Sequence, residues 1–558
     1  MPAKRLSGRT YSSSDLTGRV LVAAAAPGRA SESAWAPLRV RVFRILWLAQ
    51  LASLIGTWMQ TVGAQWLLVD QPNASTLVAL VQTATMLPVL LLALPAGVLA
   101  DAYDRRRLLI AVQVFQFAVG VALTVLTVAG RLPPALLLAL TFLLGCGTTL
   151  MMPGWQALTP ELVSRSELPA ASALGGVAQN LARAVGPAIG GVLIAHVGVA
   201  AVFALNAASY ALLGFVLLRW RREAEDVTDL PERFGGAILA GGRYVRHAPV
   251  VRRIMLRSAL FVVPGAALWA LLPLAASRLL RLGPSGYGLL LAALGVGAVI
   301  GAFALPRIRA RLPASRSVLL AGLVFAAGML VVALVRTPAV VAAALVPAGL
   351  AWLAVLATLN ATMQLFLPNW VRARGLSVYQ VVFLGGQGIA ALGWGLFAQW
   401  WGLPTTFLVA ALLMALGAVS IVRWPLHDVH GMDRNPAAYW PEPHLEFEPD
   451  PHDGPVLVTR VYRVPEERVP RFLEAMTRVR RSRLRTGATS YGLYRDGADP
   501  QRFVEVSQYP TWAEHLRQHA GRLTGTDQAY EEEATALVEG RPEVAHLFPA
   551  KAEPPSTG

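Results

Sequence analysis

The sequence is short of cysteine and of charge. Its one cysteine, Cys146, leaves no disulfide framework to hold a fold together. Only 15% of its 558 residues are charged, whereas 55% are hydrophobic, and the mean hydropathy is +0.50. A chain of this length and apolarity does not fit a soluble domain, so the composition predicts a membrane protein.

Acidic residues are scarcer than basic ones, and the formal net charge is +16. The bases gather in short loops between apolar runs, as the orientation of a membrane protein requires, so we expect membrane lipid and no nucleic acid as a partner. No Asp or Glu lies inside an apolar run. A proton carrier would therefore be peripheral, and the candidates are Asp70, Asp101, Glu161 and His196.

Long apolar runs make up most of the chain. A helix needs about 20 residues to cross the hydrocarbon layer of a membrane. We predict twelve such helices, over residues 44–69, 76–100, 107–129, 134–154, 171–195, 199–219, 254–278, 286–306, 316–335, 338–364, 375–399 and 403–422. Because alternate loops carry most of the arginines, we expect both termini to be cytoplasmic.

The two halves of the apolar region repeat. Gly97 falls on Gly301 when the chain is shifted by 204 positions, and Gly191 falls on Gly395. Two six-helix halves around a central site are typical of a transporter that works by alternating access. We expect a disordered tail over 1–40, halves over 41–220 and 253–423, and a cytoplasmic central loop over 221–252.

The stretch GVLADAYDRRRLL, residues 97–109, resembles the loop between the second and third helices of the major facilitator superfamily. The resemblance implies the major facilitator fold, an all-α membrane protein with twelve transmembrane helices. It also implies that an acid at the helix end contacts the other half in one conformation only. We expect gating roles for Gly97, Asp101, Asp104, Arg105, Arg106 and Arg107; Arg105 and Arg106 can pair with nearby acids, and Asp104 tolerates a left-handed backbone.

The fifth predicted helix carries a second motif. Gly186, Pro187, Gly190 and Gly191 resemble the GPxxGG core found in exporters of this superfamily. Small residues let helices approach closely and proline bends a helix, so this segment can seal the cavity against leak. Ordinary packing of small residues is the alternative.

Arg183 lies in the middle of the same helix, where a charge costs at least about 2.5 to 3.5 kcal/mol. It should face a cavity, or alternatively donate to backbone carbonyls. Polar residues at helical spacing predict the rest of the cavity lining: Gln50, Thr57, Gln60, Gln179, Asn180, Tyr379, Gln380 and Gln387. Trp58, Trp66, Trp269 and Trp394 either stack on the cargo or anchor helices at the interface.

Residues 34–425 resemble more narrowly the branch that contains the enterobactin exporter and related secretion transporters. The resemblance implies a secondary active, proton-coupled exporter of a small amphipathic or anionic molecule, such as a drug-like compound or a siderophore, in the bacterial inner membrane. We expect no enzymatic activity, no cofactor and no metal. A nutrient importer of the same fold is the alternative.

After a linker over 424–455, the pattern of residues 456–550 predicts the order βαββαβ, a small ferredoxin-like α+β domain. It resembles the dimeric α/β-barrel domains of antibiotic-biosynthesis monooxygenases, which implies a homodimer. A membrane-tethered monooxygenase or a haem-handling enzyme is the rival function. His515 and His519 can bind metal or haem; without a third candidate ligand, we expect them on a solvated helix face.

Overall fold

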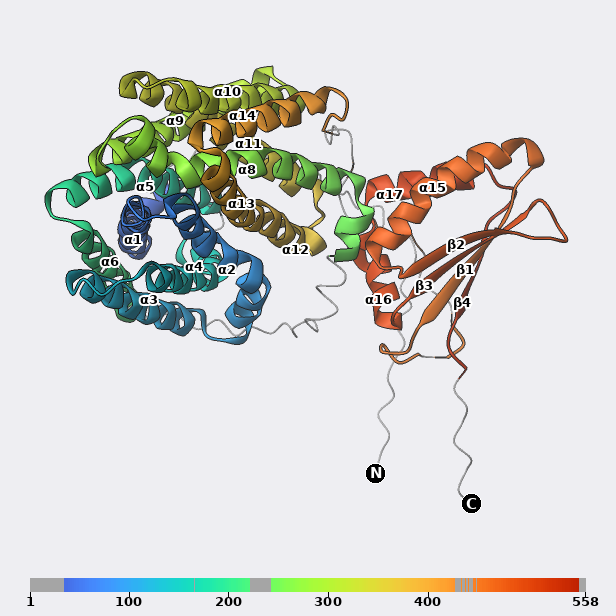
Figure 1. The fold of residues 1–558 in the computed structure, drawn as a ribbon. Helices are drawn as coiled ribbons and strands as arrows, with labels where there is room; N and C mark the ends of the chain where they lie inside the picture. Colours follow the sequence, from blue (N-terminus) through green and yellow to red (C-terminus); the bar gives the residue numbers. More distant parts are fainter. Residues whose placement is uncertain are drawn as a thin grey trace, which may run out of the picture.

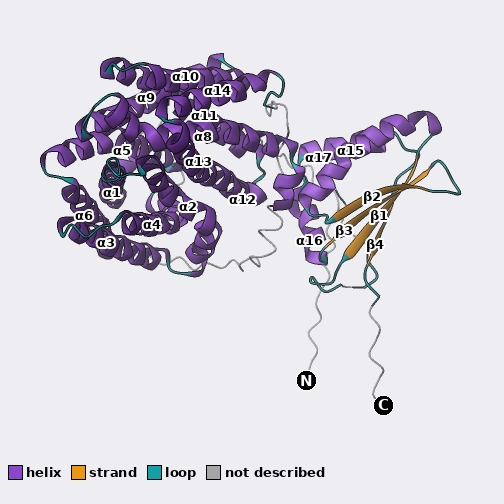
Figure 2. Cartoon of the chain, viewed as in Figure 1, coloured by secondary structure: helices purple, strands orange, loops and turns teal. Residues whose placement is uncertain are grey.

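The structure is a computed structural model that describes residues 35–164, 166–220, 242–426, 433, 437, 440, 445–447 and 449–550. Most of the predicted N-terminal tail, most of the central loop and much of the linker lie outside the described residues. In the part that is described, twelve helices are long and apolar enough to cross a membrane. The predicted twelve-helix membrane fold is therefore confirmed (Figures 1 and 2).

Six helices form the first half. They are α1 (Arg41–Trp66), α2 (Ala74–Ala102), α3 (Arg105–Val128), α4 (Pro134–Leu162), α5 (Leu168–His196) and α6 (Val199–Arg219). Proline stands in the first turn of α4 and α5, where its missing N–H costs nothing. Gly198 separates α5 from α6 with φ of +100°, a backbone conformation that residues other than glycine rarely adopt.

The second half repeats this arrangement. Its helices are α8 (Pro249–Leu274), α9 (Pro284–Arg311), α10 (Ala314–Leu334), α11 (Pro338–Phe366), α12 (Asn369–Gln380), α13 (Gly386–Trp401) and α14 (Leu403–Val419). A π-helical turn over Val381–Gly385 joins α12 to α13, so that these three segments make one interrupted span. Such turns are frequent at functional sites.

The two halves meet through α5 against α9 and through α2 against α13. The first contact is close from the middle of α5 to its end: a methyl group added at Gly295 of α9 would overlap the Cα of Ala184, and one added at Gly191 would lie 3.1 Å from the Cα of Gly288. Near the start of α5 the helices have separated, since a methyl group at Gly175 or Gly176 would meet nothing within 4 Å. The bundle is thus closed at the end that contains His196 and open at the end that contains the α2–α3 loop.

A separate α+β domain follows. It consists of β1 (Val456–Arg463), α15 (Val469–Thr486), β2 (Ser490–Arg495), β3 (Arg502–Tyr509), α16 (Trp512–Arg517), α17 (Gly525–Thr535) and β4 (Glu543–Leu547). The strands form one antiparallel sheet in the order β2-β3-β1-β4. The predicted ferredoxin-like order is confirmed.

The helices of this domain cover one face of its sheet and lie between the sheet and the membrane helices (Figure 1). Alternate residues of β1 and β3 point into that layer, among them the buried Tyr462 and Phe503, which contact Phe472 of α15. No described segment of the chain covers the opposite face, where Leu457 and Leu547, directly opposite each other, are exposed.

Candidate functional site

A cavity of about 410 Å³ lies between the two halves. The first half contributes residues of α1, α2, α3, α4, α5 and α6, and the second half contributes residues of α8, α11, α12 and α13 and of the π-helical turn. Both polar and aromatic side chains line it, but among the described lining residues there is no Asp or Glu. The cavity can therefore accept an amphipathic molecule without repelling an anion.

Arg183 provides the charge of this cavity. Its guanidinium carbon lies 5.4 Å from the ring centre of Trp58 on α1 and 5.7 Å from that of Trp269 on α8, so the side chain bridges the two halves. The Nε and Nη1 atoms are buried and have no hydrogen-bond partner among the described residues. These two atoms therefore do not donate to backbone carbonyls of the described residues, which was the alternative role. The two rings offset part of the desolvation cost through cation–π attraction.

Most of the predicted cavity residues lie together. Gln387, the repeat counterpart of Arg183, lines the same cavity, as do Gln50, Thr57, Gln179, Tyr379 and Gln380. Asn180 and Gln60 do not line it. The side chain of Asn180 donates to the carbonyl of Gly176 one turn earlier on α5. Whether the lining residues bind the cargo stays a prediction.

Gln60 faces the neighbouring helix rather than the cavity. Its Oε1 accepts a hydrogen bond from Asn206 of α6, whose amide also donates to the hydroxyl of Tyr210 at 3.2 Å. The stripe of polar residues on α1 borders both the cavity and α6. Thr57 lines the cavity and also lies 3.4 Å from the hydroxyl of Tyr210 on α6. Asn206, a lone amide in an apolar helix, was the readable sign of this network.

The four tryptophans singled out in the sequence have different surroundings, and both of their expected roles stay predictions. Trp58 and Trp269 lie in the cavity with ring centres 6.1 Å apart, and Trp352, which the sequence did not single out, lies 5.3 Å beyond Trp269. Trp66 instead stacks on Tyr287, and Trp394 donates its ring N–H to the carbonyl of Val263 at 2.7 Å. The last two are held by contacts within the bundle.

A second cavity of about 570 Å³ extends from the first. It lies between α1, α4 and α5 and shares Gln50, Thr148 and Gln179 with the central cavity. Its other lining residues include Phe43 at the start of α1 and Leu162 at the end of α4. The central cavity is therefore reached from the open end of the bundle, where the α2–α3 loop lies.

The charged residues of the α2–α3 loop have different partners. Asp104 is the N-cap of α3 and accepts a hydrogen bond from the backbone N–H of Arg107 at 2.8 Å, with φ of −56°, so the left-handed backbone is not adopted. Arg105 forms the expected ion pair, with Glu161 of α4 at 2.7 Å. Gly97 lies in open space, and the side chain of Asp101 lies outside the described residues.

The guanidinium of Arg106 donates to backbone carbonyls rather than to a carboxylate. It donates to the carbonyls of Leu217 and Leu218 at 2.9 and 2.7 Å, at the end of α6. Arg257 of α8, a buried charge that the sequence did not single out, does the same for α14, donating to the carbonyl of Gly417 at 3.0 Å and to both oxygens of Ser420. Each arginine satisfies unpaired carbonyls at the negative end of the last helix of its half.

The GPxxGG-like segment places α5 between α1 and α9. Gly186 faces the backbone of α1 at Ile55, and Gly190 faces Met59 one turn further on. Gly191 points the other way and contacts Gly288 on α9. A side chain at these positions would force the helices apart, so the motif lets α5 pack closely against α1 of its own half and against α9 of the other half.

The C-terminal domain contacts the membrane helices directly. Arg243, just before α8, forms an ion pair with Glu514 of α16 at 3.3 Å. Trp370 at the start of α12 lies against Arg522, 4.6 Å from ring centre to guanidinium, and against Tyr244, 5.7 Å between ring centres. These contacts join the domain to the interrupted span.

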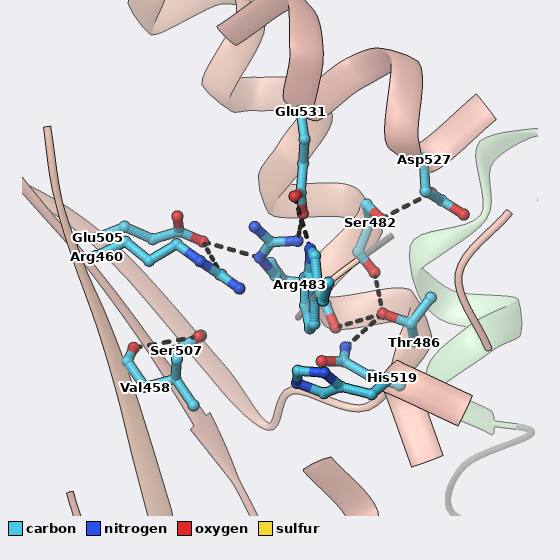
Figure 3. A network of polar contacts seen from close by, with 12 residues as sticks. Val458, Arg460, Ser482, Arg483, Thr486, Glu505, Ser507, His519, Asp527 and Glu531 are labelled. Atoms are coloured by element: carbon cyan, nitrogen blue, oxygen red, sulfur yellow. Dashed lines mark hydrogen bonds and ion pairs between the residues drawn. The ribbon is translucent and has the colours of Figure 1, made fainter. Parts of the chain in front are cut away.

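A polar network lies under the sheet of this domain. Figure 3 shows the Arg483 guanidinium between the carboxylates of Glu505 and Glu531, with Arg460 beside Glu505. Burial opposes ionisation of Glu505, but the guanidiniums of Arg483 and Arg460 hold its pKa below the ordinary value. The network is thus made of paired opposite charges.

The expectation that His515 lies on a solvated face is wrong. The side chain is fully buried, and burial, followed by the charges of His519 and His546, lowers its pKa to about 2. His546 of β4 supplies the third histidine that the sequence reasoning lacked. Helical spacing alone could not reveal it, because the strand that carries it is brought to α16 only by the fold.

Known proteins resemble this chain in sequence and in fold. It is 24% identical to the staphyloferrin A transporter of Staphylococcus aureus over 46% of this chain and 64% of that protein. It is 29% identical to the enterobactin exporter of Salmonella typhimurium over 47% of this chain and 62% of that protein. The chain therefore matches less than two thirds of the length of these relatives.

Among solved structures, a bacterial homologue of the human lysosomal transporter Spinster, in an inward-facing and unoccupied conformation, has the same fold. The TM-score is 0.54 at 16% identity, over 69% of this chain and 95% of that one. The description of the family whose pattern matches residues 32–553 is transmembrane secretion effector. Since this match runs from before α1 to beyond β4, the chain belongs to the transmembrane secretion effector family.

Proposed function

We propose that the protein exports a small amphipathic organic anion across the bacterial inner membrane by alternating access. The observation that carries the proposal is Arg183, whose charge lies in the central cavity between two tryptophans and without an acidic partner among the lining residues. The names of a staphyloferrin A transporter and an enterobactin exporter support the same class of cargo, and the second name supports the outward direction.

The chemistry of the cavity favours an anion with an apolar or aromatic body. A guanidinium offers a fork of N–H donors that fits a carboxylate or a catecholate in two-point contact, which an ammonium does not. Trp58 and Trp269 present ring faces beside that fork. Uptake of a cargo that supplies the missing charge also removes the cost of burying Arg183 alone.

Everted membrane vesicles test the proposal, because an exporter accumulates its cargo inside them. The panel is an aromatic carboxylate, a catecholate, a neutral isostere and a cationic isostere, each with and without a pH gradient. We expect wild type to accumulate the two anions and collapse of the gradient to stop accumulation, as proton coupling requires. Accumulation only in right-side-out vesicles would support import instead.

Variants at Arg183 give the sharper comparison. Arg183→Gln should insert normally and lose anion accumulation, and Arg183→Lys should restore little, because it keeps the charge and loses the fork. The matched control is Arg131→Gln, which removes an exposed arginine from the loop after α3. Equal anion transport by all four proteins would show that Arg183 does not recognise the charge of the cargo.

We also propose that both termini are cytoplasmic and that the protein forms homodimers through the exposed sheet face. The excess of arginine in alternate loops supports the orientation. The uncovered apolar pair Leu457 and Leu547 supports pairing of two sheets face to face. Light scattering of the purified chain should give a dimer for wild type and a monomer for Leu457→Lys. A monomer for both would contradict the proposed homodimer.

A further inference from the structure

Three histidine side chains converge in the C-terminal domain. The Nε2 atom of His515 lies 3.0 Å from Nε2 of His546 and 3.3 Å from Nε2 of His519. All three rings offer nitrogens within 4.8 Å of one another. They come from α16, from the π-helical turn that follows it over Gln518–Arg522, and from β4, so the fold assembles the group from distant positions.

The spacing suits one shared metal ion. Zn–N bonds of about 2.0 to 2.1 Å in tetrahedral geometry put neighbouring ligand nitrogens about 3.3 Å apart. Of the three separations, one equals this length at 3.3 Å and a second is shorter, at 3.0 Å. Hydrogen bonds to other groups do not explain the arrangement of His515, because it is fully buried and its Nδ1 has no partner in the described part of the chain.

The register of the sheet aims His546 at this point. It lies directly opposite Val458 of β1, whose side chain is buried under the helices, and residues directly opposite in a sheet share a face. The aromatic rings of Tyr509, Trp512 and Trp440 surround the histidines, with centres 4.7 Å from His515, 5.4 Å from His515 and 4.9 Å from His519. The group is thus enclosed in a largely apolar shell.

Nearby charge does not exclude a cation. Arg460 and Arg483 lie close enough to act on His515. Both are paired: Glu505 lies 3.0 Å from Arg483 and 3.7 Å from Arg460, and Glu531 contacts Arg483 (Figure 3). Two guanidiniums and two carboxylates cancel, so the three imidazoles meet a locally balanced field.

We propose that His515, His519 and His546 bind one divalent first-row transition ion of the zinc type. Three imidazoles with no thiolate suit zinc, copper, nickel or iron rather than magnesium or calcium. The ion would join β4, the last strand of the described sheet, to α16. Because Glu514 of α16 holds Arg243 before the first helix of the second half, the ion would stiffen the part of the domain that contacts the membrane helices.

Cobalt titration of the full chain tests the site without any transport assay. The protein, purified in detergent without a histidine tag and stripped with EDTA, is titrated with Co²⁺ and followed by visible d–d absorption. We expect tetrahedral-type bands that saturate at one equivalent per chain and disappear on addition of Zn²⁺. His519→Gln and His546→Gln should each weaken binding by at least about 100-fold, more than the loss of an outer-shell partner.

The control variant is His452→Gln, which removes an exposed histidine whose side chain contacts Asp450. It should bind Co²⁺ as wild type does. Thermal unfolding adds a readout for any variant with altered folding: Zn²⁺ should raise the Tm of wild type and of His452→Gln, and leave that of His546→Gln unchanged. Absence of bands in wild type, or equal bands in the His519→Gln and His546→Gln proteins, would overturn the proposal.

Discussion

If the protein alternates between two conformations as proposed, a single methyl group at Gly191 should shift the balance between them. In the observed conformation, the added carbon of Gly191→Ala would lie 2.5 Å from the carbonyl oxygen of Pro284 and 3.1 Å from the Cα of Gly288. Both are backbone atoms of the opposing half, so relief requires the halves to separate at this end. Overpacking of this kind costs about 1 to 3 kcal/mol.

That cost applies to the closed state of this end alone, so it appears as a population shift of about 5- to 150-fold toward the state in which this end is open. Gly175→Ala is the matched variant near the other end of α5, where the added carbon meets nothing within 4 Å. It should leave the observed conformation unstrained.

Spin labels at Val197→Cys and Val340→Cys, in a Cys146→Ser background, report the distance between the halves at the end that is closed here. We expect Gly191→Ala to move the distance distribution to longer values and Gly175→Ala not to do so. Identical distributions for wild type and Gly191→Ala, with both proteins folded, would refute the claim that the α5–α9 contact is a conformation-dependent closure.

Three further results are expected. Arg106→Gln should lower the Tm of the membrane part, because it removes two charge-assisted hydrogen bonds to the end of α6 worth about 1.5 to 3 kcal/mol each, whereas the exposed Arg107→Gln should not. Glu505 and Asp527 have lowered pKa values in the folded domain, so the stability they contribute is present above about pH 4 to 5 and is lost as the pH falls further. Calorimetry from pH 6 to 3 should show a falling unfolding temperature of the C-terminal domain, and a constant unfolding temperature would contradict this. Trp370→Ala should loosen the domain from the membrane helices and speed proteolysis of the linker, and an unchanged rate would count against that contact.

Periodic features were readable from the sequence because they repeat along one chain segment. Twelve apolar runs, the repeat and the βαββαβ order each follow from local patterns of hydrophobicity. The placement of Arg183 in a cavity follows from the cost of a charge in the middle of an apolar helix. None of these inferences requires knowledge of which segments meet.

Features that depend on which elements meet were not readable. Gln60 and Thr57 share one stripe of α1 and both contact α6, yet only Thr57 lines the central cavity, since helical spacing does not say which neighbour lies where. Arg106 was expected to be able to pair with an acid, but it donates to open carbonyls at the end of α6. His546 joins His515 only because antiparallel pairing of β4 with β1 brings the end of the domain back to α16.

The most direct test of the account is the affinity of a matched pair of ligands, an aromatic carboxylate and its carboxamide, for the purified protein. Calorimetric titration of wild type should show the carboxylate binding at least about tenfold more tightly, a difference of about 1.4 kcal/mol for the unpaired guanidinium. In Arg183→Gln the ratio should fall to about 1, with the carboxamide affinity little changed. Equal affinities of wild type for the two ligands, or the same preference for the carboxylate in Arg183→Gln, would contradict the assignment of Arg183 as the group that recognises the charge of the cargo.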